Sequence, residues 1–570
     1  MIIVACARGH NASTTLLVDG KVVFYVEEER LSRAKHDGAP LLGLMKVFDY
    51  VDHIDHLVVC HTHRHGPVLD WTGEGLYEGL IRKLAHKKFE FEVHHIDMIH
   101  HKMHAACAFY NSGFESAACV IADGAGSFLS YPHISNECFY EFETIYKMEL
   151  PTTLQQVYKH TGTKDSIGII HQDDVENPNL YLTEYPGHTK LYEAITEYCG
   201  FSSIDAGKTM GLAPYGKPNP EIPQLITDDG WVNREVIIPT YPNGARINFE
   251  RYPILKEDVQ KHEKGSYTQV QMDMAYAVQE ATQKRMIDLI EKAVDLTGET
   301  NIAIAGGYGL NCVANWEYWK KYPDLNIYCE PISHDGGTSI GAAKYVWSLL
   351  KTESKEELGD LKQDSIYYGP VYDPATYEGA LEGLETSVTN AKEVAQLIRD
   401  GNIVTIFQGR SEGGPRALGN RSILFDPTIP DGKDIVNIVK RREFFRPFAG
   451  SMLAEHVDEW FDLAGRKETP HMMYAAKCQP GVEDKVPSII HEDGTCRIQT
   501  VTEEQNPAYY ELISEFHKLS GVPILFNTSF NLGGDSLVET IEDAVDTLKK
   551  SDMEYMYLPE LGKLVKVPNE

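Results

Sequence analysis

Two histidines and two aspartates have the side-chain types and spacing of a metal site. His100 and His104 lie four residues apart in a helix-compatible run, so their imidazoles would share one helical face. Asp123 ends the apolar run AACVIA, and Asp335 opens the glycine-rich turn DGGT. A carboxylate at the end of a strand lies where α/β folds expose ligand sites. This donor set predicts a site for Fe(II), Mn or Zn, against the alternatives of chance histidine spacing and aspartates that only cap turns.

Glycine-rich turns form a second set of candidates. One turn follows the apolar strand expected at residues 302–305, and another follows Asp123. Such turns let backbone N–H groups approach a phosphate or a ribose closely, although each turn alone is a weak sign of nucleotide binding. The candidate residues are Gly124, Gly306, Gly307, Gly309 and Asn311.

The segment from Arg410 to Arg446 is basic, with eight basic against five acidic residues, in a chain whose formal net charge is −31. Arginine forks match phosphate and carboxylate oxygens, and glycines are interleaved with them here. The segment therefore predicts a site for a small phosphorylated ligand, and a solvated salt-bridge face is the alternative. Further on, Arg497 and the strand-end pair Asn527 and Ser529 could fix a ligand or form ordinary turns.

The elements that must position these residues alternate between strands and helices, which predicts an α/β fold. Asp19-Gly20 between two apolar runs predicts a hairpin over residues 14–26, and a long helix is expected from about 270 to 296, with Gly298 as its C-cap. Apolar strands are expected at residues 1–6, 56–60, 117–122 and 302–305. The polar stretch 352–364 indicates a domain boundary.

Composition limits the class of protein. The 570 residues are 42% apolar and 24% charged, which excludes a disordered, collagenous or coiled-coil chain. The excess of 84 acidic over 53 basic residues argues against broad binding to nucleic acid or anionic membrane. The ten cysteines include no CxxC pair, and there is neither a signal core nor an apolar run long enough to span a membrane. We therefore expect a soluble, cytoplasmic protein.

Ordered motifs along nearly the whole chain resemble those of the O-carbamoyltransferases of the NodU/CmcH type. They are GHNASTTLLVDG, EEERLSRAKHD, HHKMHAACAF, VIADGAG, GKTMGLAPYG, AGGYGLNCVAN, SHDGGTSIGAA, GRSEGGPRALGNRSIL, FFRPFAGS, HEDGTCRIQTV and VPILFNTSFN. The resemblance implies an N-terminal domain at 1–355 with an actin/Hsp70-like (ASKHA, RNase H-like) α/β fold in duplicated halves. It also implies a linker at 356–365 and a YrdC-like α/β domain at 366–570.

In such enzymes, Mg-ATP and carbamoyl phosphate give carbamoyl adenylate in the C-terminal domain, and a substrate hydroxyl attacks this intermediate in the metal-containing N-terminal domain. The resemblance implies that His10 is a general base near the acceptor and that Lys440 and Arg497 act on the donors. The implied metal ligands are His100, His104, Asp123 and Asp335. The implied nucleotide or carbamoyl-adenylate site contains Gly124, Lys208, Gly306, Gly307, Gly309 and Asn311. The implied ATP and carbamoyl phosphate site contains Arg410, Arg416, Arg421, Arg446, Asn527 and Ser529.

The acceptor is the least defined part of this prediction. The expected acceptor is a small-molecule hydroxyl on a sugar, an antibiotic-like alcohol or a hydroxymethylated nucleotide, and region 127–204, which departs from the family pattern, is expected to shape its pocket. The resemblance allows a homodimer. Two alternatives are a tRNA threonylcarbamoyl transferase-like enzyme, which the acidic charge opposes, and a non-catalytic ATP-binding switch protein.

Overall fold

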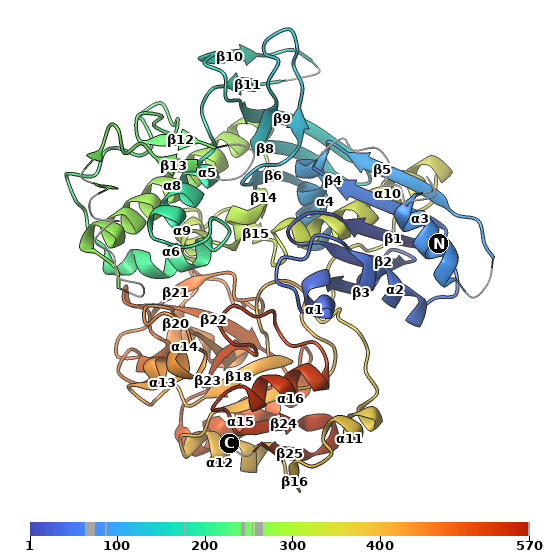
Figure 1. Ribbon diagram of the computed structural model, residues 1–570, viewed down its shortest axis with the longest axis vertical. Helices are drawn as coiled ribbons and strands as arrows, with labels where there is room; N and C mark the ends of the chain where they lie inside the picture. The colour runs from blue at the N-terminus through green and yellow to red at the C-terminus, as the bar shows by residue number, and fades with distance from the viewer. Residues whose placement is uncertain are drawn as a thin grey trace. The chain divides into compact units, whose positions relative to one another are not determined.

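The computed structural model describes residues 1–62, 75–85, 88–175, 178–240, 245–253, 255–256 and 266–567 (Figure 1). The chain forms two compact units. The first comprises Met1–Val23, Gly38–Ala314 and Asp324–Gln363, and the second comprises Phe24–Asp37, Asn315–Pro323 and Asp364–Glu570. Both contain mixed sheets and helices, so the α/β prediction is confirmed. The second unit includes two short segments from the N-terminal part of the sequence, which a single boundary near residue 360 does not predict.

The first unit contains two larger sheets whose central strands follow the same order (Figure 1). In the five-stranded sheet β3-β2-β1-β4-β5, strand β1 pairs antiparallel with β2 and parallel with β4. In the eight-stranded sheet, the run β9-β8-β6-β14-β15 repeats this pattern, because β6 pairs antiparallel with β8 and parallel with β14. The strands of the first sheet are β1 (Ile2–Ala7), β2 (Ser13–Val18), β3 (Lys21–Glu27), β4 (His56–His61) and β5 (Glu92–Asp97). Those of the second are β6 (Ser116–Ala122), β7 (Phe128–Leu129), β8 (Phe139–Glu149), β9 (Thr153–Gly162), β10 (Ile169–Gln172), β11 (Leu180–Thr183), β14 (Asn301–Ala305) and β15 (Asn326–Cys329).

Local sequence signals account for several of these elements. Asp19 and Gly20 both have positive φ, 47° and 84°, as a two-residue turn between β2 and β3 requires, so the hairpin prediction is confirmed. The long helix α8 (Gln269–Thr297) begins at a capping box on Thr268 and ends at Gly298, also as predicted.

One apolar core joins the two sheets of the first unit. It contains residues of β1 and β4, of β6 and β14, and of the helices α4 (His100–Ser112) and α10 (Thr338–Ser354). Because α4 is buried along most of its length, its first turn is held firmly against the strand ends. The other helices of this unit are α2 (Leu41–Lys46), α3 (Leu76–Leu84), α5 (His188–Tyr198) and α6 (Ala206–Leu212).

The second unit is built on a ten-stranded mixed sheet in the order β16-β25-β24-β17-β18-β23-β19-β22-β21-β20 (Figure 1). Its strands are β16 (Glu385–Val388), β17 (Val404–Phe407), β18 (Arg421–Phe425), β19 (Ala449–Leu453), β20 (Phe461–Asp462), β21 (Ala475–Cys478), β22 (Thr495–Val501), β23 (Ile524–Ser529), β24 (Tyr555–Leu558) and β25 (Lys563–Lys566). Its helices include α1 (Glu28–Ser32), α11 (Tyr377–Ala380), α12 (Ala391–Arg399), α13 (Gly432–Val439), α14 (Val457–Trp460), α15 (Pro507–Ser520) and α16 (Ile541–Lys549). Within the described residues of both units, no helix is long and apolar enough to cross a bilayer.

Candidate metal centre and anion-binding cluster

Four side chains from distant parts of the sequence meet in the first unit. His100 and His104 lie one turn apart on α4, Asp123 follows the end of β6, and Asp335 follows β15 in a short 3₁₀ turn. The two histidine Nε2 atoms are 3.0 Å apart, and His100 Nε2 lies 3.4 Å from Asp123 Oδ2 and 3.3 Å from Asp335 Oδ1. All four ligand atoms lie within 4.8 Å of one another. The structure therefore brings the four predicted metal ligands together.

Burial and charge at this cluster fit a metal ion. The side chains of His100 and His104 are 6% and 1% exposed, and those of Asp123 and Asp335 are 10% and 13% exposed. Burial alone would raise the pKa of both aspartates, but the histidines hold these pKa values below the usual range. For His100 burial acts in the opposite direction and would lower the pKa. The carboxylates of Asp335 and Asp123 outweigh this effect and raise the pKa of His100 to about 10. The buried carboxylates thus require positive charge, and two nitrogens with two oxygens suit Fe, Mn or Zn.

Neighbouring groups fix the orientation of these ligands. The backbone N–H of His100 donates to Ser127 Oγ at 3.0 Å, and the N–H of Gly307 donates to Asp123 Oδ1 at 3.0 Å. His101 is not one of the four clustered ligands although its ring centroid lies 6.2 Å from that of His100, and its Nδ1 is 2.8 Å from Thr144 Oγ1. Such supporting bonds hold metal ligands in one orientation.

The glycine turn after β14 contacts Asp123, one of the candidate metal ligands. Gly306 has φ +88°, and a Cβ on this residue would lie 2.3 Å from the carbonyl oxygen of Ala122. Only glycine allows the turn to approach β6 so closely, and the approach brings Gly307 N–H to Asp123. Spacing alone predicted nucleotide binding for this turn, and that role stays a prediction.

Replacing Gly306 with alanine should destabilise the protein by more than about 2 kcal/mol, because a positive-φ strain of about 1–2 kcal/mol adds to a backbone collision. Gly298 is a matched control, since it has φ +71° with no atom of the described residues within 4 Å of an added Cβ. Gly298→Ala should therefore cost only the strain. Urea unfolding measures both, and equal losses would contradict the argument.

The other residues predicted for the first unit have varied environments. Asn311 and Gln279 exchange amide hydrogen bonds of 3.0 and 3.2 Å, and Lys208 Nζ lies 3.1 Å from Asp205 Oδ2. A Cβ on Gly124 would lie 2.3 Å from a carboxylate oxygen of Glu193. These contacts fix the local structure, and nucleotide binding here stays a prediction.

His10 lies beside the candidate metal centre. Its Nδ1 is 3.6 Å from Asp335 Oδ2, and its side chain is 53% exposed. An imidazole that contacts a ligand carboxylate and also faces solvent could reach an arriving hydroxyl.

In the second unit, basic side chains gather near the end of β23. Lys440 follows α13, and its buried ammonium donates to the carbonyl oxygen of Ser529. Burial, followed by the charges of Arg442 and Arg446, holds the pKa of Lys440 well below its usual value. Burial, Arg446 and Arg497 lower the pKa of Arg442 in the same way. We call Lys440, Arg442, Arg446 and Arg497 the cation cluster; like charges this close favour a bound anion.

Sheet register connects this cluster with the predicted strand-end residues. Ala449 of β19 pairs with Arg497 of β22 on one side and with Asn527 of β23 on the other. Directly paired residues share one face of a sheet, and residues two apart on a strand do as well. Arg497, Asn527 and Ser529 therefore lie on the same face.

Arg442 was missed as a site residue, although the sequence shows it among the basic residues of this segment. Its Nε is buried with no hydrogen-bond partner in the described part of the chain, and the Nε of Arg497 is in the same state. A buried guanidinium with a donor left over can bind a ligand oxygen. The triplet Lys440-Arg441-Arg442 gives no sequence signal for which member is buried.

Arg421, one of the predicted phosphate ligands, is bonded to backbone carbonyl oxygens. It has no exposed surface, and its guanidinium donates to the carbonyl oxygens of Gln408 at 2.6 Å, Asn420 at 3.0 Å, Gly409 at 3.2 Å and Glu539 at 3.1 Å. Bonds to four carbonyls use its donors. In this structure Arg421 thus holds the turn together and does not point a donor at a phosphate site.

Arg410 similarly donates to the carbonyl oxygens of Tyr368 and Gly369, both at 2.6 Å, whereas Arg416 is half-buried and Arg446 lies 3.4 Å from Glu443. Charge counting thus found the basic segment but could not separate arginines that bind the backbone from those of the cation cluster.

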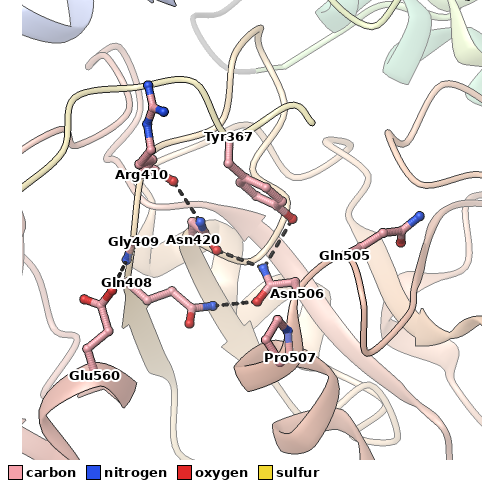
Figure 2. A pocket seen from close by; sticks show the side chains of 9 residues that line it. All are labelled: Tyr367, Gln408, Gly409, Arg410, Asn420, Gln505, Asn506, Pro507 and Glu560. Atoms are coloured by element: carbon pink, nitrogen blue, oxygen red, sulfur yellow. Dashed lines mark hydrogen bonds between the residues drawn. The ribbon is translucent and has the colours of Figure 1, made fainter. Parts of the chain in front are cut away.

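The second unit contains a cavity of about 230 Å³, and Figure 2 draws the side chains that line it. Its amide side chains bond to one another: Gln408 Nε2 donates to Asn506 Oδ1 at 3.2 Å, and Asn506 Nδ2 donates to Asn420 Oδ1 at 2.9 Å. The cavity is smaller than the roughly 300–1,000 Å³ of usual ligand pockets. Its polar groups support the loop that carries Arg410 and Arg421. The lining residues are Tyr367, Gln408, Gly409, Arg410, Asn420, Gln505, Asn506, Pro507 and Glu560.

Comparisons with known proteins match each of the two parts of the chain to a family model. Residues 73–344 match the family model described as "Carbamoyltransferase N-terminus", and residues 395–563 match "Carbamoyltransferase C-terminus". Nodulation protein NolNO of Sinorhizobium fredii is 31% identical over 96% of this chain and 77% of its own length. Nodulation protein NolO of Bradyrhizobium diazoefficiens is 33% identical over 80% of this chain and 77% of its own length.

Among solved structures, full-length HypF in the phosphate- and nucleotide-bound form is similar to 62% of this chain and 47% of its own, with 11% identity and a TM-score of 0.35. That likeness is too low to support a conclusion. The family models and the two relatives are sufficient, and the chain belongs to the carbamoyltransferase family and is a transferase enzyme.

Proposed function

We propose that this enzyme is an ATP-dependent O-carbamoyltransferase that works in two steps, one in each unit. The observation that carries the proposal is the cation cluster of the second unit, which lies near Asn527 and Ser529 in a chain of the carbamoyltransferase family. One buried lysine and three half-buried arginines that repel one another suit a substrate with several phosphate charges, such as Mg-ATP together with carbamoyl phosphate.

In the first step, water cleaves carbamoyl phosphate to carbamate and phosphate, and a carbamate oxygen attacks the α-phosphorus of ATP. Pyrophosphate leaves, and carbamoyl adenylate remains. Arg442 and Arg497 neutralise phosphate oxygens on which negative charge develops. Lys440 donates to the carbonyl oxygens of Ser529 and Asn531 and to Asn531 Oδ1, and so holds the end of β23 in place beside the donor. The amide NH2 of Asn527 donates to Ala417 and Ser451, and its buried Oδ1, which has no hydrogen-bond partner among the described residues, accepts from the NH2 of the carbamoyl group.

In the second step, an acceptor hydroxyl attacks the carbonyl carbon of carbamoyl adenylate, and AMP leaves. A metal ion bound by His100, His104, Asp123 and Asp335 would supply positive charge to the phosphate or carbonyl oxygen of the intermediate. His10 accepts the hydroxyl proton, because it borders this cluster and is open to solvent. Gly307 N–H keeps Asp123 in place during the reaction.

The finer architecture belongs to the same proposal. The repeated strand order of β3-β2-β1-β4-β5 and β9-β8-β6-β14-β15 supports an actin/Hsp70-like fold with duplicated halves in the first unit. We further propose that the second unit is YrdC-like, with its donor site on the face shared by Arg497, Asn527 and Ser529.

Pyrophosphate release from ATP tests the first step. Release should require carbamoyl phosphate, and label from isotopically marked carbamoyl phosphate should appear in a small alcohol from a panel of sugars and amino sugars. Incubation with total tRNA and threonine in place of the panel tests the threonylcarbamoyl alternative. Release that is independent of carbamoyl phosphate would overturn the proposed first step, and label only in tRNA would overturn the proposed acceptor.

A further inference from the structure

A second group of metal-type ligands lies in the first unit, on the first sheet. His56 lies at the start of β4, and Glu92 and His94 lie near the start of the edge strand β5 (Figure 1). In the parallel register of these strands, His56 pairs with Glu92. His94 is two residues beyond Glu92, so all three side chains project from one face of the sheet.

The ligand atoms of this group are close enough to share one ion. His56 Nδ1 lies 3.1 Å from His94 Nε2 and 3.6 Å from Glu92 Oε2. Zinc with nitrogen ligands at about 2.0–2.1 Å in a tetrahedral arrangement separates neighbouring ligand atoms by roughly 3.4 Å. The observed separations bracket this value. The three atoms belong to the histidine and carboxylate side chains that zinc favours.

The three side chains differ in burial. The side chain of His56 is 12% exposed, whereas that of Glu92 is 73% exposed and can move to complete the site. The carboxylate of Asp55 adds further negative charge near His56.

We propose that His56, Glu92 and His94 bind a zinc-type divalent ion with one coordination position open to solvent. This site is distinct from the cluster at His100, because about 10 Å of strand separates His94 from the end of β5 and α4 begins only beyond that end. The ion would tie the edge strand β5 to β4. The proposal does not depend on the two-step reaction.

Zinc titration of the full-length protein, after removal of metals with a chelator, tests the proposal. Wild-type protein should bind two Zn²⁺ per chain, and His56→Ala/His94→Ala should bind one. His100→Ala/His104→Ala should also keep one, with the affinity of the site on β4 and β5. His95→Ala is the matched control, because His95 neighbours His94 on the same strand but faces the other side and lies 3.6 Å from Glu78; it should bind two.

Glu92→Gln serves as a mild variant, since its exposed position spares the fold. It should weaken zinc binding at the site on β4 and β5 by about 10-fold, and His94→Ala should weaken zinc binding at the same site by on the order of 100-fold. Substitution with Co²⁺ in the His100→Ala/His104→Ala protein should give the visible absorption of a tetrahedral site. Zinc binding in the wild type that His56→Ala/His94→Ala leaves unchanged, or no zinc in the His100→Ala/His104→Ala protein, would overturn the proposal.

Discussion

Replacing Arg442 with methionine should reduce carbamoyl-phosphate-dependent pyrophosphate release by roughly 10²–10³-fold without lowering the free energy of unfolding. Arg442 is half-buried, and this burial, together with the like charges of Arg446 and Arg497, lowers its pKa. Its charge is therefore costly in the folded chain, and an apolar side chain of similar length removes that cost. The same charge is required when phosphate oxygens arrive. Pyrophosphate release should thus fall while the free energy of unfolding does not.

Arg421→Met is the matched control for this prediction. Because Arg421 bonds to four backbone carbonyls and has no exposed surface, its loss should lower the free energy of unfolding by on the order of 3–5 kcal/mol. Pyrophosphate release should then fall only with the folded fraction. Arg442→Lys, which keeps a charge but loses the fork, should retain part of the activity. If Arg442→Met lost as much stability as Arg421→Met, with activity following the folded fraction, Arg442 would be a structural residue.

The contrast between these arginines shows what the sequence could predict. Residue types at strand ends were enough to predict that the four candidate metal ligands lie together, because Asp123 follows a strongly apolar strand and a helical repeat of four places His100 and His104 on one face. The direction in which an arginine guanidinium points cannot be predicted in this way. It depends on which backbone carbonyls of folded turns lie nearby, and those are set by the tertiary structure.

The two units alternate along the sequence, and this alternation also depends on contacts between distant residues. Residues 24–37 and 315–323 belong to the second unit, although they are far from residue 364 in sequence. Arg30 donates to the carbonyl of Gly414 at 2.7 Å, and Trp319 stacks on Tyr474 with ring centroids 3.4 Å apart. Such partners lie more than a hundred residues away, so neither composition nor periodicity near these segments predicts them.

Replacing His104 with glutamine should reduce carbamoyl transfer to the best acceptor of the panel on the order of 10³-fold, while pyrophosphate release continues. His104 is 1% exposed, and its Nε2 lies 3.6 Å from Asp335 Oδ1 and 3.9 Å from Asp123 Oδ2. Without this imidazole, two buried carboxylates keep only one histidine, and the site loses one of four ligands. A metal-dependent step depends on several kcal/mol of charge stabilisation, which corresponds to a loss of this size.

His101→Gln is the control, because His101 is equally buried on the same helix, but its Nδ1 pairs with Thr144 Oγ1 and it is not one of the four clustered ligands. It should keep both transfer and the metal that the wild type binds. Metal content, pyrophosphate and labelled acceptor are measured on the same samples, so a folding defect would lower all three together. If His104→Gln stopped pyrophosphate release while Arg442→Met spared it, the two units would have the opposite roles. Loss of transfer with pyrophosphate release intact in His104→Gln requires two sites, because a single site would lose both reactions. Arg442→Met should lose both, since transfer needs the adenylate.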